Sequence, residues 1–138
     1  MDKLFVDTDI AFDIITDRKP FSAHAATLFS WADFRQVQLY VSSLTFPNLY
    51  YSLRKIHPHV EVIRQLKNLD KSTTTIAVDE KIIRSALDSG FSDFEDAIQY
   101  FCALRITGIE AIITRNTRDF KLSTLPVLTA ESYIKSIR

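Results

Sequence analysis

The chain has 138 residues, of which 46% are hydrophobic, and it carries 17 acidic and 17 basic residues. This length and apolar content suit one ordinary domain with a substantial core, so we expect residues 1–138 to form a single domain. The single cysteine, Cys102, argues against a disulfide scaffold and for a reducing compartment. With only two glycines, Gly90 and Gly108, the chain cannot build a glycine-rich phosphate-binding loop, which excludes nucleotide cofactors bound in that way.

The amino-terminal residues 1–9 lack a signal-peptide pattern, and no apolar run approaches the length of a membrane span. We therefore expect a cytoplasmic protein that does not contact a membrane. Because acidic and basic residues balance, any contact with nucleic acid must come from a local basic patch rather than from the overall charge.

Short apolar or β-branched runs alternate with helical periodicity along the chain. Residues 4–6, 38–42, 73–78, 111–114 and 126–129 are predicted strands. Helices are predicted from Asp9, from Ser22, over 44–55 and 58–69, from Asp79 to Gly90, over 93–106, and from Thr129 to Ile137. Strands that are separated by helices favour a single-domain, three-layer α/β/α fold around a central parallel sheet.

The helix predicted at 93–106 opens with three acids: Asp93, Glu95 and Asp96. Ser92 is the predicted N-cap, with Glu95 three residues later as in a capping box. The helix dipole favours acids in a first turn, and this suffices to explain Asp93 and Glu95. Asp96 lies at the edge of the buried stripe, where a carboxylate needs a compensating cation. A divalent metal ion is the obvious candidate.

Other polar residues follow two of the predicted strands. Asp7 and Asp9 follow the first strand, and Asn116 and Asp119 follow the fourth. Asp9 can be explained as a helix cap, whereas Asp7 cannot. Since the carboxyl ends of parallel strands share one edge of a sheet, we expect these residues to meet the acids of the 93–106 helix. Gathered carboxylates are stable as ligands of Mg²⁺ or Mn²⁺, which suits metal-assisted phosphodiester hydrolysis.

Four stretches give the chain a resemblance to the PIN-domain family, which includes VapC-like toxins and other metal-dependent ribonucleases. They are FVDTD (5–9), SSLTFPNL (42–49), FEDAIQ (94–99) and ITRNTRDF (113–120), and together they extend the resemblance over essentially the whole chain. The resemblance implies that the first metal-binding aspartate of the family is Asp7 and that its third acid is Asp96. The second acid, usually glutamate, falls on Asn48, and the fourth, often aspartate and sometimes asparagine, falls on Asn116.

An amide offers a carbonyl oxygen but no charge, so we expect weaker metal binding unless Asp93 or Asp119 compensates. The resulting hypothesis is a Mg²⁺ or Mn²⁺ site. Its predicted metal ligands are Asp7, Asp96, Asp93 and Asn48, and its predicted catalytic residues are Asp7, Asp96, Asn116 and Asp119.

Arg115 and Arg118 flank this site and are the predicted RNA-binding residues, with solvated surface as the alternative. Tyr50 and Tyr51 either stack on an unpaired base or belong to the core. The resemblance further implies RNA as substrate, an antitoxin protein as partner, and a homodimer.

Three functional interpretations compete. The first is a PIN ribonuclease that acts as the toxin of a toxin–antitoxin pair. In the second, the same fold binds RNA or protein without cleaving it, an interpretation that rests on the amides at Asn48 and Asn116. The third is a phosphohydrolase of the haloacid dehalogenase type, which the pair Asp7 and Asp9 suggests.

Overall fold

The computed structural model describes residues 1–137, which form a five-stranded sheet with helices on both faces. All neighbouring strands are parallel, in the order β3-β2-β1-β4-β5. The strands are β1 (Asp2–Val6), β2 (Val37–Ser42), β3 (Thr74–Ile76), β4 (Ile109–Ile113) and β5 (Val127–Leu128). The predicted parallel sheet is therefore confirmed, although the edge strands β3 and β5 are shorter than predicted.

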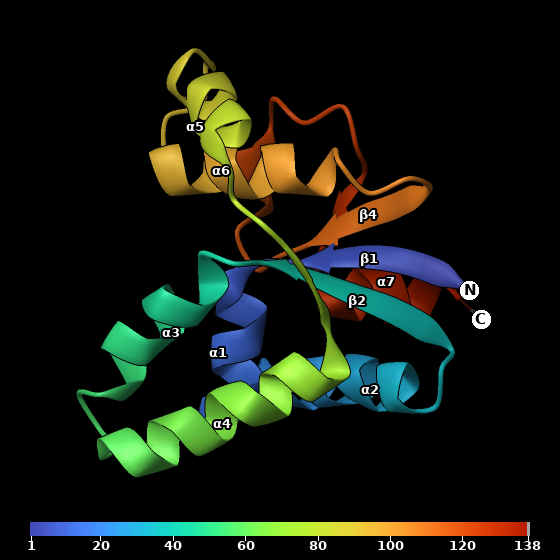
Figure 1. The fold of residues 1–138 in the computed structure, drawn as a ribbon. Helices are drawn as coiled ribbons and strands as arrows, with labels where there is room; N and C mark the ends of the chain where they lie inside the picture. The colour runs from blue at the N-terminus through green and yellow to red at the C-terminus, as the bar shows by residue number, and fades with distance from the viewer. Residues whose placement is uncertain (138) are drawn as a thin grey trace.

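The helices form two layers, as Figure 1 shows. One layer, which shares a hydrophobic core with one face of the sheet, comprises α1 (Thr8–Thr16), α2 (Ser22–Asp33), α3 (Thr45–Leu53), α4 (His59–Ser72) and α7 (Ala130–Ser136). The other layer comprises α5 (Glu80–Leu87) and α6 (Phe94–Ala103). No helix among residues 1–137 is both long and apolar enough to cross a membrane.

The central strand β1 separates two hydrophobic cores. Leu4 and Val6 pack into the core under α1 to α4, whereas Phe5 packs into the core under α5 and α6. All three side chains are fully buried. Successive side chains of a strand point to opposite faces, so a strand that is covered on both faces is apolar throughout. This burial anchors the residue that follows β1, Asp7, at the edge of the sheet.

Two helices begin differently from the prediction. The N-cap of α6 is Asp93 rather than Ser92, and its carboxylate accepts a hydrogen bond from the Asp96 amide at 3.0 Å. The N-cap of α1 is Asp7 rather than Asp9. A carboxylate caps a helix as well as a hydroxyl does and also gains from the helix dipole. An aspartate therefore takes the capping position in both helices.

Three further boundaries are corrected. Ser22 is the first residue of α2 rather than its N-cap, because its hydroxyl donates to Asp17 at 2.8 Å instead of to the helix. Helix α3, which extends over Thr45–Leu53, is shorter than the helix predicted over 44–55. Helix α6 ends at Ala103, before the predicted 106.

Candidate active site

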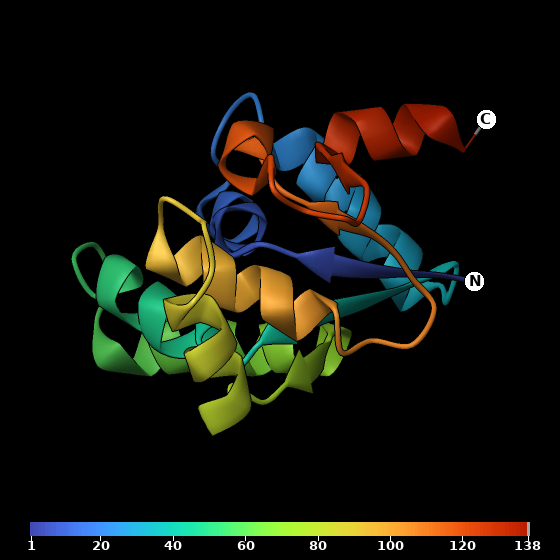
Figure 2. The same ribbon diagram turned by 90° about the horizontal axis from the view of Figure 1, so that it is seen from above.

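Four segments that are distant in sequence meet at the carboxyl edge of the sheet. The strands β1 and β4 are adjacent, and the Asp7 amide donates to the Ile113 carbonyl at 2.9 Å. The start of α1 and the loop after β4 are therefore neighbours. In Figure 1 the amino end of α6 lies in the layer above α1 and α3, and hydrogen bonds from Gln99 to Thr45 and from Asn48 to Glu95 join α6 to α3. Figure 2 shows the same helices from above. Every predicted site residue lies on one of these four segments.

Asp7 occupies the centre of this edge and is only 8% exposed. Its carboxylate accepts hydrogen bonds from the Thr8 amide at 2.8 Å, the Thr114 hydroxyl at 2.8 Å and Gln99 Nε2 at 3.3 Å. Burial raises the pKa of Asp7, the three hydrogen bonds oppose this rise, and the nearby charge of Asp119 adds to it. The side chain is thus held in one position but is costly to ionise.

Asp9 is a second partly buried carboxylate beside Asp7. Its Oδ2 accepts from the Arg115 amide at 3.1 Å, from the Thr114 hydroxyl at 3.3 Å and from Asn116 Nδ2 at 3.4 Å. Its Oδ1 is buried and has no hydrogen-bond donor. Burial and the charge of Asp7 raise the pKa of Asp9 to about 7.

Asp96 completes the acidic cluster from the first turn of α6. Its pKa is raised to about 7, chiefly by burial and then by the charges of Asp7, Asp93, Asp119 and Asp9, in that order of size. The structure therefore brings the predicted acids Asp7, Asp93 and Asp119 within electrostatic reach of Asp96.

A pocket of about 320 Å³ opens beside these acids. The residues that line it are Asp7, Thr8, Asn48, Tyr51, Ser52, Glu95, Asp96 and Gln99. Within the pocket, Asn48 Nδ2 donates to Glu95 Oε2 at 3.4 Å. Asn116, the other predicted amide, lies outside the pocket and faces Asp9.

The chemistry of this edge fits a hard divalent cation. The atoms available as metal ligands are oxygens, which Mg²⁺ and Mn²⁺ prefer. The charge of Asp7 makes Asp9 and Asp96 harder to ionise. Two buried oxygens, Asp9 Oδ1 and Gln99 Oε1, accept no hydrogen bond. Within residues 1–137, no three acidic, histidine or cysteine side chains are close enough to form a ready metal cage. Binding of a cation would therefore have to draw the carboxylates together.

The two predicted RNA-binding arginines have different surroundings. Arg115 Nε donates to the fully buried carboxylate of Asp13 at 2.7 Å, and its guanidinium lies 4.7 Å from the centre of the Phe21 ring. Arg118 is exposed on the 3₁₀ helix η1 (Thr117–Phe120). Arg118 is thus free to contact a ligand, whereas Arg115 is held by Asp13.

Sequence reasoning missed several residues of this edge. Gln99 donates to Asp7, to Thr8 and to Thr45, and so joins α6 to α1 and α3. Its position three residues after Asp96, on the same side of α6, is a signal that the sequence contains. Thr114, which donates to Asp7, carries no comparable signal.

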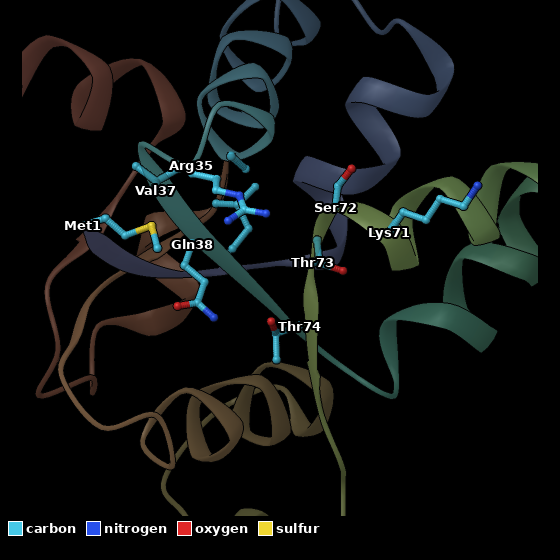
Figure 3. Close-up of a pocket in the computed structure, with 10 residues that line it drawn as sticks. Met1, Arg35, Val37, Gln38, Lys71, Ser72, Thr73 and Thr74 are labelled. Carbon is cyan, nitrogen blue, oxygen red and sulfur yellow. The ribbon is translucent and has the colours of Figure 1, made fainter.

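A second hollow, of about 270 Å³, lies at the opposite edge of the sheet, near the start of β2. Figure 3 shows the side chain of Arg35 lying against β2 and that of Lys71 pointing away from it, with the hydroxyls of Thr73 and Thr74 at the start of β3. The acids described above all lie at the other edge. The acidic pocket is therefore the candidate active site.

A family model described as the PIN domain matches residues 3–118. The chain belongs to the PIN domain family. This membership confirms the family resemblance and replaces the haloacid dehalogenase interpretation. A comparison with curated protein sequences gave no match.

Solved structures of toxin–antitoxin proteins share this PIN fold. The toxin–antitoxin complex from Klebsiella pneumoniae has a TM-score of 0.66 and 23% identity, with 92% of this chain and 97% of that chain covered. VapBC2 from Rickettsia felis bound to a promoter DNA fragment has a TM-score of 0.66 and 16% identity, with 91% and 96% covered. VapC20 from Mycobacterium tuberculosis, a toxin that cleaves the sarcin–ricin loop, has a TM-score of 0.60 and 17% identity, with 79% and 86% covered.

The raised carboxyl pKa values predict that the metal-free PIN domain loses stability as pH rises. Asp9 and Asp96 have pKa values of about 7 in the folded protein, against an ordinary aspartate pKa of 3.8, so between these values the folded state binds more protons than the unfolded state. The free energy of unfolding should then fall between pH 5 and pH 8, by roughly 2 kcal/mol after allowance for solvent screening of the half-buried Asp96.

Urea unfolding at both pH values in the presence of a chelator measures this loss. Asp96→Asn should reduce it, because one of the two groups no longer titrates. A free energy of unfolding that is equal at pH 5 and pH 8 would contradict the electrostatic description of the site.

Proposed function

We propose that this PIN domain is a Mg²⁺- or Mn²⁺-dependent endoribonuclease that hydrolyses phosphodiester bonds of single-stranded RNA. The observation that carries the proposal is the acidic pocket, which both Asp7 and Asp96 line and in which the charge of Asp7 helps to raise the pKa of Asp96. When bound there, the divalent cation supplies an acidified water molecule and neutralises charge that develops on the phosphate.

The site residues would have different roles in binding the cation. Asp7 and Asp96 would hold the cation, with Asp93 and Asp119 adding negative charge nearby. Thr114 and Gln99 orient Asp7 by donating to its two oxygens. Since carboxylates must lose their protons to bind a cation, metal binding would release protons near neutral pH.

The proposed partner is an antitoxin protein, which would make this chain the toxin of a pair. The support is the shared fold of toxin–antitoxin complexes from Klebsiella pneumoniae and Rickettsia felis, and of the RNA-cleaving VapC20. Co-expression with the product of a neighbouring short reading frame, followed by co-purification, tests this partner.

The central experiment incubates the protein with single-stranded RNA and, separately, with a small phosphate ester, with Mn²⁺ or with a chelator. Cleavage of the RNA that requires Mn²⁺ supports the proposal. The second candidate function, RNA binding without cleavage, is favoured by the amides Asn48 and Asn116, and binding of uncleaved RNA in the presence of Mn²⁺ would select it. Hydrolysis of the ester alone would refute both.

We expect an unpaired base of the RNA to stack on the aromatic ring of Tyr51. Its side chain is 75% exposed on the rim of the acidic pocket, whereas Tyr50 is half-buried and bonded to His59. Stacking of a base on an aromatic ring contributes roughly 1–3 kcal/mol. Tyr51→Ala should therefore weaken binding of single-stranded RNA by about tenfold, as measured by fluorescence anisotropy in a chelator.

Phe34 provides the matched control. It is also 75% exposed, but it follows α2 at the opposite edge of the sheet. Phe34→Ala should leave RNA affinity unchanged, and Tyr51→Trp should preserve it. Equal affinities of the Tyr51→Ala and Phe34→Ala variants for RNA would remove Tyr51 from the binding surface.

A further inference from the structure

Asn48 and Asn116, the amides at the positions to which the family resemblance assigns its second and fourth polar residues, share a feature. Asn48 on α3 donates its Nδ2 hydrogen to Glu95 on α6, and Asn116 after β4 donates its Nδ2 hydrogen to Asp9 on α1, each at 3.4 Å. In both cases the amide faces a carboxylate that a neighbouring element supplies. The pattern therefore occurs twice, on four different segments.

We infer that the two missing carboxylates have moved to Glu95 and Asp9, so that these residues are cation ligands and Asn48 and Asn116 are positioning residues. The inference rests on the proposed metal-dependent function. It restores a site of four carboxylates, Asp7, Asp9, Glu95 and Asp96, although the sequence pattern retains only two. For a hard cation the number of charged ligands sets the affinity, so the relocation offsets the substitution of both acids.

The bonding of Asp9 supports this role. Its three hydrogen-bond donors all reach Oδ2, which leaves Oδ1 buried without a donor. An unpartnered buried oxygen is destabilising, so this oxygen favours a ligand that would satisfy it. A cation satisfies this oxygen. Asp9 also shares the Thr114 hydroxyl with Asp7, which places the two carboxylates next to each other.

The position of Glu95 supports the same role for this residue. It lines the pocket together with Asp7, Asp96 and Gln99. Glu95 and Gln99 are four residues apart and therefore share one side of α6. Gln99 is 2% exposed, and its Oε1, like Asp9 Oδ1, is a buried oxygen with no donor. An exposed first-turn acid would ordinarily point to solvent, whereas Glu95 is held by Asn48 across the pocket.

Single neutralisations test the ligands. Binding of Mn²⁺ is measured from the loss of the free-ion signal in electron paramagnetic resonance, which needs no catalysis. Glu95→Gln and Asp9→Asn should each raise the Kd for Mn²⁺ at least about tenfold, since each removes one charge from the site. Asp70→Asn, which removes an exposed acid of α4, is the matched control and should leave the Kd unchanged.

Charge-conserving exchanges test the positioning residues. Asn48→Glu combined with Glu95→Gln, and Asn116→Asp combined with Asp9→Asn, return each carboxylate to the position at which the family carries it. Each double variant should bind Mn²⁺ with a Kd within about threefold of that of the wild type, because the site charge is conserved. Circular dichroism melting of each variant identifies any loss of Mn²⁺ binding that arises from misfolding. If a single variant does not fold, the Kd of the corresponding double variant still tests the inference.

The outcomes separate this inference from the proposed function. If the wild type binds Mn²⁺ and neither single neutralisation weakens the binding, Glu95 and Asp9 are not ligands, while the metal-dependent function still stands. Exchanges that bind Mn²⁺ as weakly as the single variants would also overturn the relocation. If the wild type neither binds Mn²⁺ nor cleaves RNA, the proposed function itself fails.

Discussion

Asp7→Asn and Asp96→Asn are each expected to lower the rate of metal-dependent RNA cleavage at least about 100-fold. Each change removes a proposed charged ligand of the cation, and the stabilisation of transition-state charge by a cation is worth several kcal/mol. The fold should survive, because neutral side chains at these raised-pKa positions avoid the cost of burying a charge. Asn at position 7 still accepts from the Thr8 amide, and Asp93 still caps α6.

Initial rates of RNA cleavage at saturating Mn²⁺, together with thermal melting, measure both parts of this prediction. The control is Asp88→Asn, which removes an exposed acid at the end of α5. Wild-type rates in both site variants would show that cleavage occurs elsewhere on the molecule.

Arg115→Gln should destabilise the protein by roughly 3 kcal/mol, whereas Arg118→Gln should have almost no effect on stability. Removal of Arg115 leaves the fully buried carboxylate of Asp13 without its cation, and the loss of one partner of a buried ion pair typically costs about 3–5 kcal/mol. The Arg115 side chain is 21% exposed, which places the effect at the lower end of that range.

Urea unfolding of the two arginine variants provides the comparison, and RNA binding as a function of salt completes it. Arg118→Gln should reduce the salt slope of RNA binding by about 0.7, the value for one phosphate contact on a single strand. Combining Arg115→Gln with Asp13→Asn should cost less than the sum of the single changes, because the unpaired charge is gone. If Arg115→Gln, like Arg118→Gln, had almost no effect on the free energy of unfolding, both arginines would be ordinary surface residues.

The fold, and the gathering of the candidate site residues at one edge of the sheet, were predictable because local rules sufficed. The apolar run of β1 is buried on both faces, and a residue that follows such a strand is placed at the carboxyl edge of a parallel sheet. Asp7 and Asp96 therefore meet as expected. The exact helix starts were less predictable, since Ser92 and Asp93 are adjacent and both can cap.

The pairings within the site depend on contacts that no local pattern encodes. Arg115 and Asp13 are 102 positions apart, and their ion pair exists only because β4 lies beside β1. From sequence alone Arg115 was indistinguishable from the exposed Arg118. Likewise, the orientation of the Asn48 amide toward Glu95 requires α3 and α6 to be packed across the pocket.

The hydrogen bond between the Asp7 amide and the Ile113 carbonyl has a consequence during protein synthesis. The carboxylate of Asp7 leaves the ribosome early, but Thr114, which orients it, is made more than one hundred residues later. Strand β1 can pair with β4 only after most of the chain has emerged, and such long-range pairing forms slowly. We therefore expect nascent chains that end before β4 to lack the proposed nuclease activity, because Asp7 has not yet gained the strand and the hydroxyl group that hold it in place.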